Sequence, residues 1–316
     1  MVFSKTLRII SKFFMAATLL LWSPTLATVS LATNHTDDLA LLAIKSSIIH
    51  DPQNVLDSWN TSFHFCHWQG VTCGHPHRRV TRLDLGSRGF AGSLSPQIGN
   101  LSFLKVINLR NNTFKGVIPP QLGNLFRLER LFLDNNSFEG EVPASLSNCT
   151  RLDTLVLGYN HLVGKFPQQL SALVNLMVLF INSNGFTGGL PSFFGNFTSL
   201  KGLSASNNYL GGSIPHTLGQ LYNLQEIYIG FNHLYGTIPP SLSNLTSLRV
   251  LSVENNSISG SLPQDMGLQL PNLEEFYIWG NKFIGSIPFS FSNCSNLLLL
   301  NLGDNGFTGK SREFGT

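Results

Sequence analysis

Apolar residues recur along most of this 316-residue chain with a period of 24 positions. The units open at Val80, Leu104, Leu128, Leu152, Leu176, Leu200, Leu224, Leu248, Leu273 and Leu297, and the unit from Leu248 carries one extra residue. Each opens with Leu-x-x-Leu-x-Leu or a close variant, which places apolar side chains on one inward face of a short strand. We therefore expect nine complete repeats and one partial repeat over residues 80–309, stacked as coils with their strands in one parallel sheet.

Polar and turn residues recur at fixed places within each unit. An asparagine follows the strand at residues 112, 136, 160, 184, 208, 232, 256, 281 and 305, whereas Arg88 stands at this place in the first unit. The side-chain amide of asparagine both donates and accepts hydrogen bonds, so it can satisfy backbone groups where the strand ends. A phenylalanine or aliphatic residue follows two positions later, then a glycine and an Ile-Pro or Leu-Pro pair. The pattern predicts an α/β repeat solenoid, a leucine-rich-repeat superhelix with parallel strands on its concave face.

The first 32 residues have the pattern of a secretory signal peptide. Lys5, Arg8 and Lys12 precede an apolar run at 13–22, and small residues follow at Ala27 and Ala32. Ten apolar residues are too few to span a membrane, and no later stretch is long enough. We expect a secreted mature chain without a membrane span.

Charge becomes informative only after this segment is removed. The formal net charge of the whole sequence is +3. Removal of the three basic residues of the signal peptide leaves 17 lysines and arginines, which equals the number of aspartates and glutamates. Charged residues make up only 12% of the chain, about half of a typical ~25%. A neutral, weakly charged chain does not fit a nucleic-acid-binding protein, for which a basic patch is expected.

Residues 33–79 are predicted to form an N-terminal cap, because an exposed first coil would leave its core open. Thr36 or Asp37 is the expected N-cap of a helix that carries Leu39, Leu42 and Ile48 and ends near residues 50–52.

The cap also holds two closely spaced cysteines, Cys66 and Cys73. In a secreted chain such a pair predicts a disulfide. The alternative is a metal site that uses the neighbouring histidines 64, 67, 75 and 77. Cys149 and Cys294 are six units, or about 30 Å, apart, so they are expected to be buried free thiols.

The motif Cys66-x-Trp68-x-Gly70-Val71-x-Cys73 is followed by units of the form LxxLxLxxNxFxGxIPxxLGNL. Over residues 34–309 this pattern resembles the extracellular part of plant leucine-rich-repeat receptor-like kinases. Residues 89–102, GFAGSLSPQIGNLS, resemble the immune-receptor subfamily that includes the flagellin, elongation-factor and rice blight-resistance receptors. The resemblance implies recognition of a peptide or protein ligand outside the cell or at the outer face of the plasma membrane, together with a leucine-rich-repeat co-receptor.

The resemblance also implies a truncation. Family members continue through further repeats, a membrane helix and a kinase, whereas residues 310–316 of this chain leave the repeat pattern. No kinase, nucleophile or metal-protease motif occurs, so we expect no catalysis, cofactor or metal. The alternative function is a secreted inhibitor that resembles the polygalacturonase-inhibiting proteins.

Side chains between the strand leucines are expected to face outward on the concave surface. Aromatic residues recur there in every second unit, and basic residues early in the array give way to acidic residues later. The candidate ligand-binding residues are Phe132, Tyr159, Phe180, Tyr228, Phe231, Tyr277, Trp279, Arg110, Arg130, Glu226, Glu254 and Glu275. Exposed aromatics anchor protein partners, and a groove of changing charge can orient an extended ligand.

The recurring aromatic residues could also result from duplication alone, because five glycosylation sequons share their two-unit period. Duplication of a 48-residue block would give both patterns without selection for binding.

Ten Asn-x-Ser/Thr sequons predict a glycosylated protein. They are at Asn34, Asn60, Asn100, Asn111, Asn135, Asn148, Asn196, Asn244, Asn255 and Asn293.

Overall fold

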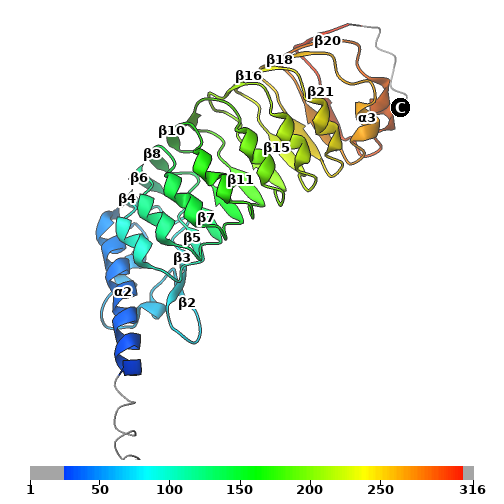
Figure 1. Ribbon diagram of the computed structural model, residues 1–316. Helices are drawn as coiled ribbons and strands as arrows, with labels where there is room; N and C mark the ends of the chain where they lie inside the picture. Colours follow the sequence, from blue (N-terminus) through cyan, green and yellow to red (C-terminus); the bar gives the residue numbers. More distant parts are fainter. Residues whose placement is uncertain (1–24, 309–316) are drawn as a thin grey trace, which may run out of the picture.

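Successive 24-residue units form successive coils of a curved solenoid in the computed structural model, which describes residues 25–308 (Figure 1). Most of the expected signal peptide and the 310–316 tail lie outside these residues. The expected boundary at residue 32 falls inside the first described helix, α2 (Thr25–Ser47). No helix in the described part of the chain is long and apolar enough to cross a bilayer.

An 11-stranded sheet follows the inner side of the bend (Figure 1). β2 (Val71–Cys73) pairs antiparallel with β3, and all later pairings in this sheet are parallel. The parallel strands are β3 (Val80–Asp84), β5 (Val106–Asn108), β7 (Arg130–Phe132), β9 (Thr154–Val156), β11 (Val178–Phe180), β13 (Gly202–Ser204), β15 (Glu226–Tyr228), β17 (Val250–Ser252), β19 (Glu275–Tyr277) and β21 (Leu299–Asn301). Each pairing joins equivalent repeat positions, so these positions form rows across the sheet.

Short strands on the opposite side of the coils form two further sheets. The first contains β1 (Ile48–His50), β4 (Ala91–Ser93), β6 (Thr113–Val117), β8 (Ser137–Gly140), β10 (His161–Gly164) and β12 (Gly185–Phe186). The second contains β14 (Gly211–Gly212), β16 (His233–Gly236), β18 (Ser257–Gly260), β20 (Lys282–Gly285) and β22 (Gly306–Phe307). An isolated bridge, Gly189–Gly211, joins them. Glycine is a poor strand former, and four glycines meet at this break.

A 3-10 helix completes most coils on the third side. These helices are η3 (Pro96–Asn100), η4 (Pro120–Asn124), η5 (Ala144–Asn148), η6 (Gln168–Ala172), η7 (Ser192–Asn196), η8 (His216–Gln220), η9 (Pro240–Asn244) and η10 (Phe289–Asn293). The coil with the extra residue has instead a short α-helix, α3 (Met266–Gln269). A proline at the N-cap of η4 to η10 supplies the extended backbone that leads into each of them.

Apolar side chains from the concave strands and the 3-10 helices, most of them leucines, fill the interior of the solenoid. The recurring asparagines form a ladder of hydrogen bonds between coils, and phenylalanines two positions after them stack as a spine. Asn160 Nδ2 donates to the carbonyl oxygens of Leu133, Leu157 and Gly158, at 3.0, 3.1 and 3.2 Å, and its Oδ1 accepts from Phe138 N at 2.9 Å. Phe114 and Phe138 stack with ring centroids 6.3 Å apart. These contacts satisfy the backbone at the strand ends and join neighbouring coils.

The cap contains α2, which packs against η3, together with η1 (Val55–Ser58) and η2 (Phe65–His67). Cys66 and Cys73 form the expected disulfide, with Cα atoms 5.5 Å apart. Both sulfurs are therefore unavailable as metal ligands, and no metal-binding group of three or more side chains occurs among the described residues. Cys149 and Cys294 are buried free thiols, as expected.

The expected helix start at Thr36 or Asp37 is wrong, because α2 already begins at Thr25. Asp37 is fully buried inside this helix and accepts hydrogen bonds from Arg79 Nε at 2.9 Å, Arg79 Nη2 at 2.7 Å and Val80 N at 2.9 Å. Of the three apolar residues expected on the helix, Leu42 is partly buried against the core, Leu39 is exposed and Ile48 belongs to β1. The buried face of α2 consists instead mainly of Ala40, Leu41 and Ile44.

Candidate ligand-binding face

One row of the concave sheet carries the four expected aromatic residues at its centre. Phe132, Phe180, Tyr228 and Tyr277 occupy the last position of β7, β11, β15 and β19, and parallel register aligns them. All four are half-buried, because neighbouring coils cover part of each ring. Val156 and Ser252, which lie between them in the row, are buried. The row is thus a line of partly covered rings separated by smaller side chains.

Two glycines explain how aromatic side chains lie on this face. A Cβ atom at Gly202 would stand 3.2 Å from the Phe180 ring, and one at Gly303 would stand 2.9 Å from Trp279. Both rings therefore lean over the next coil, where the absent side chain leaves room. Each ring thus covers part of the neighbouring coil, and aromatic rings supply a large apolar contact area.

The basic part of the face is largely neutralised by neighbouring acids. Arg110 pairs with Asp134 at 3.0 Å and lies 5.6 Å above the Phe132 ring, and Arg82 pairs with Asp84 at 2.6 Å. Asp134 occupies the repeat position of Arg110 in the following coil, so alignment of the units would have revealed this pair. Arg130 is exposed and has no side-chain partner among the described residues. Its guanidinium therefore remains available to a ligand on this part of the face.

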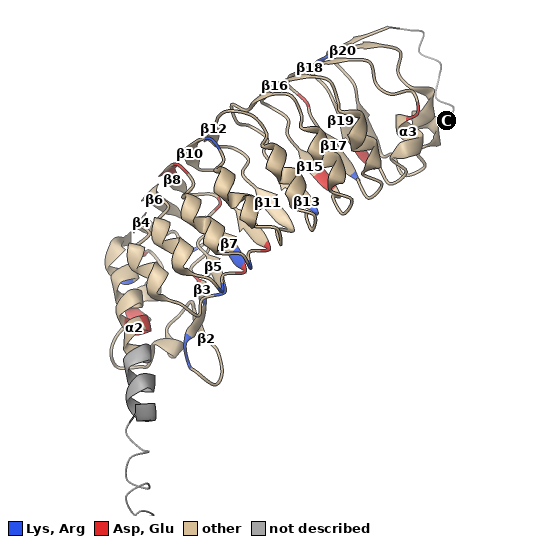
Figure 2. Ribbon diagram, viewed as in Figure 1, with Lys and Arg blue, Asp and Glu red and all other residues tan. Residues whose placement is uncertain are grey.

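The acidic part of the face, unlike the basic part, forms no ion pairs with residues of opposite charge among the described residues. Glu226, Glu254 and Glu275 have no basic partner among the described residues, because the nearby Arg249 pairs with Glu274 at 2.8 Å. Ser252 Oγ donates to Glu254 at 2.5 Å, and the Tyr277 hydroxyl donates to Glu275 at 2.9 Å. Charged residues are sparse elsewhere on the ribbon (Figure 2).

The acidic cluster also affects the tyrosine at its centre. Burial raises the pKa of Tyr228, and the negative charges of Glu226 and Glu275 raise this pKa further. The neutral phenol is therefore maintained beside the carboxylates. The Tyr228 hydroxyl can donate a hydrogen bond to a ligand or a neighbouring carboxylate, but it carries no positive charge that would balance the glutamates.

Tyr159 and Phe231 lie on the rim of the face rather than on its strands. Both adopt left-handed backbone, each with φ of 54°, and both are exposed. The equivalent residues in other coils are mostly Asn, Ser, Asp or Gly, which tolerate this conformation better than aromatic residues do. Strained residues cluster at functional sites, so the two exposed rings are candidates for contact with a ligand.

The sequons divide into two main groups. Asn100, Asn148, Asn196, Asn244 and Asn293 are exposed at the last position of 3-10 helices. Asn111, Asn135 and Asn255 lie on the left-handed rim beside the concave face. Asn60 is exposed in the cap, and the side chain of Asn34 lies outside the described residues. Glycans at the first group would project from the helical side and leave the concave face open.

Two family models match the chain. One, described as a leucine rich repeat N-terminal domain, matches residues 34–74, and another, a leucine-rich repeat region, matches residues 89–303. The chain belongs to the leucine-rich-repeat family. The second match covers most of the strands and 3-10 helices described above, and the first contains the disulfide.

Several curated relatives are plant receptor kinases. The LRR receptor-like serine/threonine-protein kinase EFR of Arabidopsis thaliana is 49% identical over 82 residues, which cover 26% of this chain and 8% of the relative. The receptor kinase-like protein Xa21 of Oryza sativa subsp. japonica is 49% identical over 83 residues, which cover 24% and 8%. The aligned part of this chain thus spans less than a tenth of the length of these relatives.

Solved structures match a larger share of the leucine-rich-repeat chain. The ectodomain of the Arabidopsis receptor kinase HAESA, solved with an IDA peptide hormone ligand, has a TM-score of 0.77 and 30% identity. The match covers 87% of this chain and 50% of that one. A plant ice-binding protein also has a TM-score of 0.77, with 29% identity over 87% of this chain and 88% of that one.

Proposed function

We propose that the chain is an extracellular recognition module that binds an extended peptide, or an extended segment of a protein, along the concave face between β7 and β19. The observation that carries this proposal is the row of half-buried aromatic rings beside three glutamates that lack a basic partner among the described residues. Rings and unpaired charges on one surface are the groups that anchor and orient protein ligands.

The spacing of the rings suits an extended ligand that runs along the solenoid axis. Rings two coils apart are separated by about 10 Å, because neighbouring strands lie ~4.8 Å apart. A polyproline II segment rises about 3.1 Å per residue and has three residues per turn, so every third side chain points the same way at a spacing of about 9 Å. Such a ligand would place successive same-facing side chains against Phe180, Tyr228 and Tyr277.

The charges favour one orientation of this ligand. A lysine or arginine of the ligand would lie over β15–β19, where Glu226, Glu254 and Glu275 converge and the neighbouring rings favour a cation. A carboxylate would lie toward β7, where the Arg130 guanidinium is exposed. The ligand's positive end is therefore expected at the C-terminal coils of the array.

Membership of the leucine-rich-repeat family and the likeness to the peptide-bound HAESA ectodomain support this function. HAESA has also been solved with the IDA peptide and the co-receptor SERK1, and that structure matches with a TM-score of 0.55 and 26% identity. By analogy, we propose that this chain acts outside the cell, as or within a receptor that also engages a leucine-rich-repeat co-receptor. We propose no catalytic role for the repeat array itself.

Selection from a display library of random peptides tests the proposal and requires no candidate ligand. Peptides selected on the intact chain should be enriched in lysine or arginine, and they should bind a Glu226→Gln, Glu254→Gln, Glu275→Gln variant at least tenfold more weakly. Glu139→Gln and Glu141→Gln together are the matched control, because these exposed acids lie away from the concave sheet. Equal binding to all three proteins, or inhibition of a purified polygalacturonase by the chain, would overturn the receptor proposal.

A further inference from the structure

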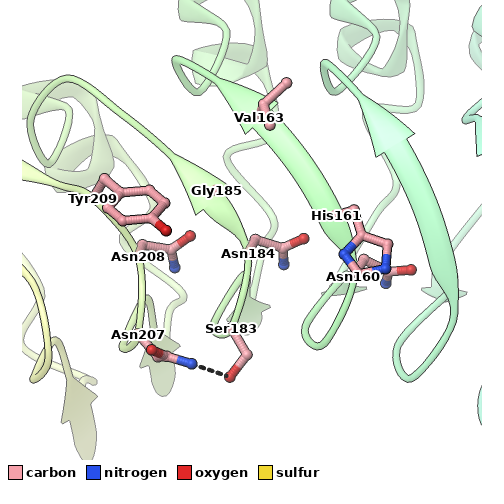
Figure 3. Close-up of a pocket in the computed structure, with 9 residues that line it drawn as sticks. All are labelled: Asn160, His161, Val163, Ser183, Asn184, Gly185, Asn207, Asn208 and Tyr209. Atoms are coloured by element: carbon pink, nitrogen blue, oxygen red, sulfur yellow. Dashed lines mark hydrogen bonds between the residues drawn. The ribbon is translucent and has the colours of Figure 1, made fainter.

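A hollow of about 410 Å³ lies on the flank of the solenoid, where the two short-stranded sheets meet. It is away from the concave row of rings and opens beside β10 and β12 (Figure 3). Its volume falls within the usual range for a small-molecule site, roughly 300–1,000 Å³.

A single missing side chain produces this hollow. The residue after the ladder asparagine is His161 in one coil, Gly185 in the next, Tyr209 in the third and His233 in the fourth. The rings of Tyr209 and His233 lie together, with centroids 6.0 Å apart. On the other side of Tyr209 the neighbouring coil has Gly185, which carries no ring, and the next ring along is that of His161 (Figure 3). The row of rings is therefore interrupted at Gly185.

Uncharged polar groups surround this gap. Asn207 Nδ2 donates to Ser183 Oγ at 3.4 Å and closes the side nearest the concave rim (Figure 3). The Tyr209 hydroxyl and the His161 imidazole have no hydrogen-bond partner among the described residues. Of the described residues, no lysine, arginine, aspartate or glutamate lines the hollow, and Val163 is its one aliphatic side chain.

We propose that this hollow binds one ring of a neutral saccharide. A pyranose has an apolar C–H face, which suits the open side of the Tyr209 ring, and a rim of hydroxyl groups, which suits the Tyr209 hydroxyl, the His161 imidazole and the Asn207 and Ser183 side chains. The other lining asparagines belong to the ladder and already bond the backbone. A charged ligand would find no counter-ion in the lining. An aromatic side chain of a protein would leave the polar rim without partners, which is unfavourable once water is excluded. The site is independent of the concave-face proposal.

The binding of cellotriose, maltotriose and chitotriose to the intact chain tests this site, measured by saturation-transfer NMR and titration calorimetry. At least one trisaccharide should bind. Tyr209→Ala should weaken that binding at least tenfold, since it removes the stacking surface, and Gly185→Ser should do the same by filling the gap. Serine is the natural residue at this repeat position in residues 137 and 257, and Gly185 does not have positive φ. An added Cβ would stand 3.0 Å from Val163 Cγ1 and 3.1 Å from the Leu162 carbonyl oxygen, so the Val163 side chain must shift slightly to admit it.

Tyr222→Ala is the matched control, because Tyr222 is 62% exposed and Tyr209 is 61% exposed, but Tyr222 does not line the hollow. Binding should be unchanged in this variant, and thermal unfolding should show that all three variants fold. The site is overturned if no trisaccharide binds the intact chain, or if Tyr222→Ala weakens binding as much as Tyr209→Ala. Binding of N-acetyltyrosinamide with the same dependence on Tyr209 and Gly185 would assign the hollow to a protein side chain instead.

Discussion

At the scale of single residues, the ion pair of Asp37 and Arg79 joins the cap to the first coil. The carboxylate accepts three hydrogen bonds, two from the guanidinium and one from the backbone of Val80. Both side chains are buried, so each depends on the other for charge compensation. Removal of one partner of a buried pair leaves an uncompensated charge in the interior, which costs far more than loss of an exposed pair.

Asp37→Ala should therefore lower the free energy of unfolding by about 3–5 kcal/mol. Chemical denaturation followed by circular dichroism measures this change. The matched control is Asp84→Ala, which breaks the partly exposed pair with Arg82 and should cost at most about 1 kcal/mol. Equal losses from the two variants would show that the Asp37 pair does not stabilise the cap.

The buried thiol of Cys149 gives a pH-dependent prediction. Its Sγ donates to the Leu122 carbonyl at 3.3 Å, and burial raises its pKa to about 12. The folded chain keeps this proton at pH values where an unfolded cysteine releases it, so the associated stability is present below the ordinary thiol pKa. It is lost as the pH rises from there toward about 12.

A thiol reagent at pH 8 should consequently label Cys149 only after denaturation, whereas unfolded chain should react at once. Mass spectrometry of the labelled peptides distinguishes Cys149 from Cys294, whose pKa burial also raises. Rapid labelling of Cys149 in the folded chain would mean that the central coils open readily.

At the scale of elements, each coil depends on hydrogen bonds to the next coil. Asn160 joins three carbonyl oxygens and one backbone N–H from two neighbouring coils. Asn305 makes the same kind of contacts in the last described coil, where its surroundings are more exposed. The ladder asparagines should therefore contribute most to the free energy of unfolding in the middle of the array, where water cannot replace their hydrogen bonds.

Asn160→Asp preserves the shape and the accepting oxygen but removes the donor to three carbonyls. We expect a loss of about 2–4 kcal/mol in unfolding free energy, because buried carbonyls lose their partner and a charge is buried. Asn305→Asp should cost about 1 kcal/mol or less, since its site is partly hydrated. Urea denaturation of the two variants provides the comparison, and a larger effect at residue 305 would reject this view of the ladder.

The repeat pattern was sufficient to predict the coils and the ladder, because they depend on residues at fixed spacing. The disulfide was predicted from two cysteines close in sequence in a secreted chain. The Asp37–Arg79 pair joins residues 42 apart across the cap and follows no period, so Asp37 was misplaced as an N-cap. Alignment of repeat columns would have revealed Asp134 beside Arg110 and the gap at Gly185. How far Phe180 leans over Gly202 depends on packing between coils and was not predictable.

At the scale of the whole molecule, different surfaces carry different chemistry. The concave sheet carries rings and unpaired glutamates, the helical side carries exposed sequons, and the flank carries the saccharide-sized hollow. Glycans on the helical side would leave both other surfaces accessible, whereas glycans at Asn111, Asn135 and Asn255 would border the concave face. If both proposed sites bind their ligands, a peptide and a saccharide would occupy different surfaces of one solenoid.

The most direct test of concave-face binding is amide hydrogen exchange with and without a selected peptide. Slower exchange is expected in the turns that follow β13, β15, β17 and β19, between residues 205 and 281, and it should be lost in a Tyr228→Ala, Tyr277→Ala variant that still folds. Protection confined to η3–η10, or protection that survives in this variant, would contradict binding at the concave row of aromatic rings.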